Sequence, residues 1–473
     1  DPRHSPGCRY HIARCHFTDH FIDISQPTLT PQYLIASFGI VAAWLARLNS
    51  PARPLGASTL EIADCSFRGG RSVPGAGATL AGGIAVVFDS EAPIRFNTST
   101  MIRDCSFANN SVTYWTEPAA AISLRFGNGR DVSPGHVLRN CSFSQNFALV
   151  EISDRQQAAL TTVVELDSVA NVMTWTIDSC RFVGNAATAT VLVSNQHPYI
   201  SVLRMRNTVF LDGVGGALVA SSGDLRLQRV SIRRQRAVTA FGGALTLSGL
   251  AYLCDLHVSC VNTSSLCSGD FGSADLAYCE LLNNTNSRQR SIVALVEPPR
   301  NQSRPYLSLR DSIVLMTGAD SGSNSFQRSI EIEWQRALAG PKLFGRSFLA
   351  CPPGFVARCE VFSCGCEPCL PRTFALGTAI YSNDVHHEWC ACARLRQRGA
   401  LTRGLYDSLE CPFGAACRLG KADIKPLVGM WARVEPAHVD IANLSVADYN
   451  APQPHVQFSM CPPDICVIEI ACT

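Results

Sequence analysis

Charged residues are scarce in this chain. They make up 16% of its 473 residues, and the formal net charge is only +2. The chain therefore lacks the electrostatic field that would favour nucleic acid or an anionic membrane as a partner. Apolar residues make up 47%, which excludes a disordered chain. A length well beyond one small core predicts two or more domains.

Long apolar runs are also absent. The longest one, over residues 33–48, is too short to span a bilayer and contains Ser37, Gly39 and Arg47. The chain begins Asp1-Pro2-Arg3, with neither an initiator methionine nor a charged-then-apolar leader. We therefore expect a fragment or a processed ectodomain of a membrane protein, whose targeting and anchoring segments lie outside this sequence.

Cysteines are plentiful and fall into two regimes. There are 22, and those before residue 250 are single and widely spaced, whereas twelve crowd together from Cys351 onward. That density is typical of a small domain held by disulfides, although the sequence does not decide their connectivity. The candidate disulfide residues are Cys260, Cys267, Cys351, Cys359, Cys364, Cys366, Cys369, Cys390, Cys392, Cys411, Cys417, Cys461, Cys466 and Cys472.

Sequons for N-glycosylation support a secretory route. Chance alone produces several of them in a chain rich in serine and threonine, so they add weight to an extracellular location without proving it. The seven candidate sites are Asn97, Asn109, Asn140, Asn262, Asn283, Asn301 and Asn443.

The first two thirds of the chain repeat a Cys-x-Phe triplet. Strong copies begin at Cys15, Cys65, Cys105, Cys141 and Cys180, and weaker ones at Thr208, Val230, Cys254, Cys279 and Ser312. Three residues before each triplet stands an apolar residue, in order Ile12, Ile62, Ile102, Leu138, Ile177, Met205, Leu227, Ala251, Leu276 and Leu309. The cysteine of the triplet is replaced by Thr208, Val230 and Ser312, so we expect it to pack as a free, buried thiol.

The parity of the repeat predicts a bent chain. Side chains alternate with period two along a strand, so the apolar residue at position −3 and the first triplet residue face opposite sides of a straight strand. Both side chains point into the core only if the chain bends between these two residues. The bend residues at position −1 include Asp64, Asp104, Asn140 and Asn207, types that tolerate the left-handed conformation. We expect a second turn at Asn110, Asn146 and Asn185.

A third apolar segment follows each pair of turns. Gly82-Gly83-Ile84-Ala85 has close relatives at Gly215-Gly216-Ala217-Leu218 and Gly242-Gly243-Ala244-Leu245. Three short strands per repeat, with 22 to 25 residues in the shortest repeats, describe coils of a stacked parallel structure. The sequence therefore predicts an all-β fold: a parallel β-helix of about ten coils over residues 1–325, a cap and linker over 326–350, and a disulfide-rich region over 351–473.

These repeats resemble the right-handed, pectin-lyase-like β-helix family. The Gly-Gly-Ala-apolar and Phe-x-x-Asn pairing is also similar to repeats of chlamydial polymorphic outer-membrane adhesins. After them, Cys351-Pro352-Pro353-Gly354-Phe355 and Cys366-Glu367-Pro368-Cys369 resemble ephrin-receptor-like or tumour-necrosis-factor-receptor-like modules. Residues 411–431 resemble a segment of large surface proteins of unicellular eukaryotes, where it precedes transmembrane segments. The resemblance implies a right-handed coil and a membrane-anchored surface protein.

Two alternatives bear on chemistry. A zinc site is one, from Cys364, Cys366, Cys369, His386, His387, Cys390 and Cys392, but Cys-x-x-Cys spacing occurs only once and disulfides are favoured. A polysaccharide lyase or hydrolase is the other, yet no paired carboxylates stand with a basic partner. Asp64 and Asp104 are interpreted as bend residues. We predict no catalytic residue, no metal site and no cofactor.

One basic run is the remaining candidate for a ligand. Arg226, Arg229, Arg233, Arg234 and Arg236 would contact an anionic glycan, although a solvated strand edge is the simpler interpretation. The leading hypothesis is a non-catalytic extracellular recognition or adhesion scaffold for surface glycans or proteins, with no nucleic acid as partner. The alternatives are a polysaccharide-active enzyme and a structural surface or wall component.

Overall fold

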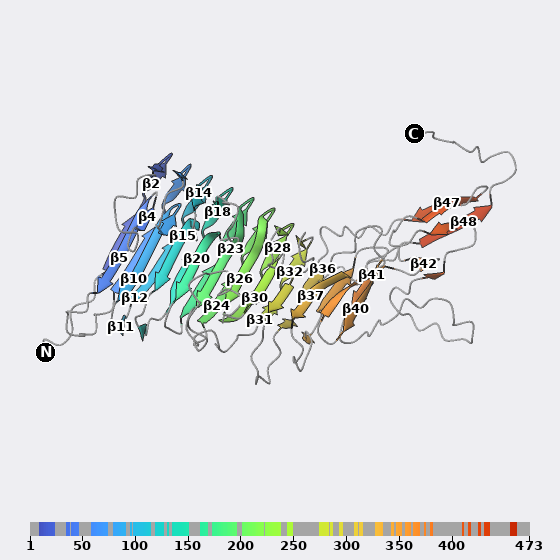
Figure 1. Ribbon diagram of the computed structural model, residues 1–473. Helices are drawn as coiled ribbons and strands as arrows, with labels where there is room; N and C mark the ends of the chain where they lie inside the picture. Colours follow the sequence, from blue (N-terminus) through green and yellow to red (C-terminus); the bar gives the residue numbers. More distant parts are fainter. Residues whose placement is uncertain are drawn as a thin grey trace. The chain divides into compact units, whose positions relative to one another are not determined.

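The computed structural model consists of β-strands joined by tight corners (Figure 1). Among the residues that the structure describes there is no α-helix, and no helix long and apolar enough to cross a membrane is found there. These residues are 9–23, 35–37, 39–46, 58–73, 79–90, 95–96, 98–114, 119–126, 130–131, 135–150, 161–168, 173–195, 201–221, 223–237, 244–248, 274–282, 284–286, 293–296, 307–310, 312–315, 327–333, 342–344, 347–351, 355–360, 363–368, 373–374, 379–381, 409–410, 415–417, 424–426, 430–435 and 455–460.

The chain divides into two compact units. The first contains Asp1–Leu309 and Ile332–Lys342, and the second contains Arg310–Glu331 and Leu343–Thr473. The first unit is built from three parallel sheets, here named A, B and C. Sheet A has the order β1 (Arg9–Ala13), β6 (Ser58–Ala63), β12 (Thr98–Arg103), β17 (His136–Arg139), β21 (Thr174–Asp178), β24 (Ser201–Arg206), β27 (Gly223–Gln228), β31 (Ala274–Ala277) and β35 (Leu307–Arg310).

Sheets B and C follow the same rule of one repeat beside the next. Sheet B has the order β2 (His16–Thr18), β7 (Ser66–Arg68), β13 (Ser106–Ala108), β18 (Ser142–Ser144), β22 (Arg181–Val183), β25 (Val209–Leu211), β28 (Ser231–Arg233) and β32 (Glu280–Leu282). The long strands of sheet C are β5 (Ile40–Ala46), β10 (Ile84–Ser90), β15 (Ala119–Phe126), β20 (Thr162–Ser168), β23 (Ala186–Asn195), β26 (Val214–Ser221), β30 (Leu245–Ser248) and β34 (Val293–Val296).

Shorter strands complete sheet C. They are β3 (Phe21–Asp23), β4 (Ile35–Ser37), β8 (Arg71–Val73), β9 (Thr79–Ala81), β14 (Ser111–Tyr114), β19 (Phe147–Val150), β29 (Arg236–Ala237) and β33 (Thr285–Asn286). A separate two-stranded sheet pairs β11 (Arg95–Phe96) with β16 (Arg130–Asp131). Stacked parallel strands with repeating corners are compatible with a parallel β-helix.

The corner between sheets A and B lies where the parity argument predicted it. The residue before each triplet has a positive φ, near 50–58°, in every described repeat of the first unit, namely Arg14, Asp64, Asp104, Asn140, Ser179, Asn207, Arg229 and Tyr278. This left-handed residue turns the chain, so the −3 residue and the first triplet residue both point into the core. The predicted bend is confirmed.

The second corner differs from the prediction by one residue. The left-handed residue lies two positions after the phenylalanine, as at Asn109 (φ 55°) and Gln145 (φ 52°), and not at the following asparagine. The asparagines Asn110, Asn146 and Asn185 are buried instead. Each Oδ1 accepts the backbone N–H of the preceding repeat at the same position, and each Nδ2 donates to a carbonyl of that repeat. Their side chains thus link repeats rather than form the turn.

The core is made of columns of like side chains, because neighbouring strands lie about 4.8 Å apart. Rings of the phenylalanine column stack nearly parallel, with centroids 4.8 Å apart for Phe67 and Phe107 and 4.5 Å apart for Phe143 and Phe182. The column also explains a glycine of the Gly-Gly phrase: a Cβ on Gly83 would lie 2.7 Å from the ring of Phe107. Facing residues of sheet C are equally buried, as Ile84, Ile122, Val164, Val191, Leu218 and Leu245 show.

The thiols of the triplets are free and mostly buried, as expected. Cys65, Cys105, Cys141, Cys180 and Cys279 are buried, and Cys15 is half-buried. The thiol donates to the carbonyl oxygen two residues earlier, for example from Cys65 to Ala63 at 3.1 Å. Thr208 makes the same bond to Arg206 at 2.8 Å. The position therefore selects a small side chain that, in most copies, donates a hydrogen bond to the corner.

Strand β27 pairs directly with β31, so Leu227 lies opposite Leu276 in sheet A. The segment that contains Cys254 lies outside the described residues. His136 is buried in β17, with its ring against Phe126 and Trp175.

The second unit begins with parallel strands and continues with antiparallel ones. β36 (Ile313–Leu315) pairs in parallel with β39 (Phe348–Cys351), so residues expected as cap and linker carry another copy of the triplet. The remaining strands are β37 (Gln327–Glu333), β38 (Lys342–Phe344), β40 (Phe355–Glu360), β41 (Ser363–Pro368), β42 (Thr373–Phe374), β43 (Ala379–Tyr381), β44 (Leu409–Glu410), β45 (Ala415–Cys417), β46 (Ile424–Pro426), β47 (Met430–Glu435) and β48 (His455–Met460). β37, β40 and β41 pair antiparallel.

Candidate functional site

The outer face of sheet A carries a cluster of arginines on two neighbouring strands. Alternation along β24 buries Leu203 and Met205 and exposes Arg204 and Arg206. The same alternation along β27 exposes Arg226, and Arg229 follows at the exposed corner. We name Arg204, Arg206, Arg226 and Arg229 the arginine patch.

The strand register brings these four residues together. Arg204 lies directly opposite Arg226, and Arg206 lies opposite Gln228. Neighbouring strands are about 4.8 Å apart and alternate residues along one strand about 6.6 Å apart, so the patch spans a small grid. Arg229 has a φ of 54°, and its corner position follows Gln228 at the edge of this grid. Four cations therefore share an area of about two repeats.

None of the four guanidinium groups has a hydrogen-bond or ion-pair partner among the described residues. Asp178 is the register neighbour of Arg206, but its carboxylate accepts from Asn207 Nδ2 at 3.2 Å and lies 3.9 Å from Arg139. Asp275 is the register neighbour of Arg226 on the other side. The register thus places one carboxylate on each side of the patch along the stack, Asp178 beside Arg206 and Asp275 beside Arg226.

Several other arginines of the described residues are paired. Arg125 donates to Glu165 Oε1 at 2.7 Å, and Glu165 is itself buried. Arg103 donates to Glu61 Oε1 at 2.9 Å. Such pairs neutralise charge inside the fold, whereas four arginines without such pairs lie together in the patch.

The basic run expected from the sequence is divided by the structure. Arg233 donates to Glu280 at 2.5 Å, and Arg234 binds both carboxylate oxygens of Asp212, at 2.5 and 2.9 Å. Arg236 lies on the short strand β29 of sheet C. Only Arg226 and Arg229 belong to the patch, so the run of five is not one surface.

An exposed aromatic residue lies beside the patch. Tyr278 has 54% of its surface exposed, and its corner position is next to that of Arg229, because Gln228 lies opposite Ala277 in the register. Its φ of 55° places this bulky residue in the left-handed region. No hydrogen bond or ring contact links Tyr278 to another described residue.

The arginines Arg204 and Arg206 and the aromatic Tyr278 escaped the sequence reasoning. The two arginines belong to the repeat before the basic run, and only the aligned register joins them to Arg226. The repeat alignment contained that signal, since all three arginines stand at fixed offsets from the triplets at Thr208 and Val230.

Some carboxylates of the first unit have structural partners. Asp64 and Asp104 lie on adjacent repeats, and the Asp104 carboxylate accepts from Asn140 Nδ2 at 2.7 Å and from Arg103 at 2.8 Å. These bonds, first that of Asn140 and then that of Arg103, lower the pKa of Asp104 below its usual range. Within the described part of the chain, no group of three or more metal-ligating side chains comes together.

The buried thiols are poor nucleophiles. Burial raises the pKa of Cys65 to about 11 and that of Cys279 to about 12. A thiol with such a pKa is almost fully protonated at neutral pH, and the thiolate is the reactive form. The column therefore serves packing.

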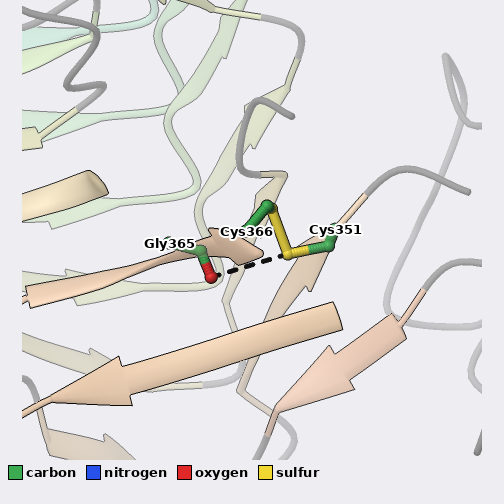
Figure 2. The surroundings of a disulfide bond; sticks show 3 residues. All are labelled: Cys351, Gly365 and Cys366. Carbon is green, nitrogen blue, oxygen red and sulfur yellow. Dashed lines mark hydrogen bonds between the residues drawn. A yellow bond between two sulfur atoms is a disulfide. The ribbon is translucent and has the colours of Figure 1, made fainter. Parts of the chain in front are cut away.

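The structure joins one pair of the disulfide candidates. Cys351 and Cys366 are bonded, with their Cα atoms 5.7 Å apart, and the Cys351 sulfur lies 3.8 Å from the Gly365 carbonyl oxygen (Figure 2). Cys364 is also disulfide-bonded. Two of the residues considered as zinc ligands are therefore not thiolates. Side chains of Cys359 and Cys417, and all of Cys260, Cys267, Cys369, Cys390, Cys392, Cys411, Cys461, Cys466 and Cys472, lie outside the described residues.

Two of the seven sequon asparagines lie within the described residues. Asn109 and Asn140 are both exposed at corners of the strand stack. The Asn140 side chain donates to Asp104, whereas Asn109 has no side-chain hydrogen bond to a described residue. The others, Asn97, Asn262, Asn283, Asn301 and Asn443, lie outside the described residues, as do His386 and His387.

Comparison of the chain with models of protein families, with curated proteins and with solved structures finds no match. The arginine patch and its neighbours are therefore the features from which function is inferred.

Proposed function

We propose that this protein is a non-catalytic extracellular scaffold that recognises an anionic surface glycan through the arginine patch. The observation that carries the proposal is the group of four exposed, unpaired arginines on β24, β27 and the following corner. Sulfate and carboxylate groups are the partners that guanidinium groups bind with two parallel hydrogen bonds. In this proposal the stack of strands is a right-handed, pectin-lyase-like β-helix that holds the patch rigid.

The cellular setting is part of the same proposal. Sequons and the disulfide between Cys351 and Cys366 support an oxidising, extracellular compartment. The protein would then be the ectodomain of a membrane-anchored surface glycoprotein with a cysteine-rich second unit. Disulfides stabilise such a unit because its apolar core is small.

The direct test is binding to glycans of defined charge. The full chain is titrated with heparin, chondroitin sulfate, alginate and a neutral glucan by calorimetry at physiological salt. Wild type should bind a sulfated or uronic glycan and ignore the neutral one. The double variant Arg204→Gln/Arg226→Gln should lose about 2 kcal/mol of binding, or about 30-fold in Kd, at roughly 1 kcal/mol for each arginine near an anionic surface.

Arg181→Gln is the matched control. Arg181 is an exposed arginine of β22 that has no partner among the described residues and does not belong to the patch. It should bind as tightly as wild type. No binding of any anionic glycan by wild type, or an equal loss in both variants, would contradict the proposal. New reducing ends in the incubated glycan would replace it with the polysaccharide-active enzyme, and self-association without glycan binding would replace it with a structural surface component.

A further inference from the structure

The corner row that contains Tyr278 holds no other aromatic residue among the described repeats. Four equivalent corners carry Asp64, Asp104, Asn140 and Asn207, whose side chains tolerate the left-handed conformation, and the other three carry Arg14, Ser179 and Arg229. An aromatic side chain at φ 55° is strained by comparison, and strain of this kind persists where the residue has a use. Folding alone would favour Asn or Gly at this position.

Packing does not explain the tyrosine either. Tyr278 exposes 54% of its surface, more than any of the other exposed large hydrophobic residues in the described part of the chain. It has neither a hydrogen bond nor a ring contact with another described residue. More than half of the Tyr278 surface is therefore open to solvent.

The charged residues around Tyr278 indicate which chemical groups a ligand at this position has. One repeat away is Arg229, and beyond it lie the exposed amide of Gln228 and the rest of the arginine patch. Asp178 and Asp275 border the patch along the stack. A long polyanion along the stack would meet both carboxylates, whereas a ligand with few anionic groups beside an apolar ring face avoids them.

We propose that Tyr278 is a specificity-determining platform on which a pyranose ring of the anionic glycan stacks, while the arginine patch binds its sulfate or carboxylate groups. This inference rests on the proposed function. The C–H face of a sugar ring is apolar and flat, so an exposed aromatic ring covers it, and the phenol hydroxyl remains available to a sugar hydroxyl. The tyrosine would thus separate glycans from other polyanions, which the arginines alone would bind equally.

The experiment compares two probes of similar charge on the same variants. One is a size-defined chondroitin sulfate oligosaccharide, which has sugar rings, and the other is inorganic polyphosphate, which has none. Tyr278→Asn should bind the oligosaccharide about tenfold more weakly, by analogy with the loss of an aromatic side chain on which a base stacks, and polyphosphate within twofold of wild type. Its thermal midpoint should equal or exceed that of wild type, because Asn suits the left-handed corner. Tyr278→Phe should retain oligosaccharide binding.

Tyr10→Asn is the control for loss of an exposed tyrosine. Tyr10 is 46% exposed on β1, and we expect wild-type binding of both probes. Unchanged oligosaccharide binding by Tyr278→Asn would refute the platform, and the proposed function would still stand if Arg226→Gln weakened both probes. If no variant altered either probe, both proposals would be wrong. Equal weakening of both probes by Tyr278→Asn would also refute the platform, as would tighter, Tyr278-dependent binding of single-stranded nucleic acid.

Discussion

Replacing the buried asparagine Asn146 by alanine should destabilise the strand stack by about 4 kcal/mol. Its Oδ1 accepts from the Asn110 backbone N–H at 3.2 Å and from Asn110 Nδ2 at 3.0 Å. Its Nδ2 donates to the Phe107 carbonyl oxygen at 3.0 Å and to Asn185 Oδ1 at 3.0 Å. Asn146 is fully buried. Four hydrogen bonds at about 1 kcal/mol each are lost, and the Asn110 N–H is left buried without its acceptor.

The assay is equilibrium unfolding in urea, followed by circular dichroism and tryptophan fluorescence on the full chain. The matched control is Gln145→Gly at the adjacent left-handed corner, where φ is 52° and glycine is compatible. It should change the free energy of unfolding by about 1 kcal/mol or less. A loss below about 1 kcal/mol for Asn146→Ala, or an equal loss in the control, would refute the view that the asparagine column holds neighbouring repeats together.

Two further predictions concern titratable groups. At neutral pH, iodoacetamide should leave Cys65 and Cys279 of the native protein unmodified and should label both in urea, because burial raises their pKa values. Peptide mass spectrometry measures the labelling, and modification of the native protein would contradict this prediction. The pKa values of Asp104 and Asp212 are lowered, chiefly by hydrogen bonds from Asn140 and Arg234 respectively. Their contribution to stability is present above the ordinary value of 3.8 and is lost as pH falls through the lowered values, so melting temperature should drop below about pH 4 and a flat profile there would overturn the assignment.

The sequence repeats predicted only part of the candidate site. The basic run in the sequence suggested five arginines on one surface, yet ion pairs remove Arg233 and Arg234 from it. The partners are carboxylates of neighbouring repeats, Glu280 and Asp212. They are far from the arginines in the sequence, so the ion pairs could not be predicted from it. The basic run in the sequence therefore indicated a cationic surface, but it did not show which arginines belong to that surface.

By itself the sequence determined the local geometry of each repeat. Alternation with period two, the apolar residue at −3 and the Asp or Asn before the triplet require a bent strand, since each acts within a few residues. The sequence did not determine which residues of different repeats are neighbours across the sheets. Repeats differ in length, so only the assembled sheets decided which residues lie side by side. Leu227 lies opposite Leu276, Arg204 opposite Arg226, and Tyr278 beside Arg229. The buried Asn146 side chain donates to Asn185 Oδ1 of the next repeat. Hydrogen bonding between strands fixes that register, and it acts between residues far apart in the chain.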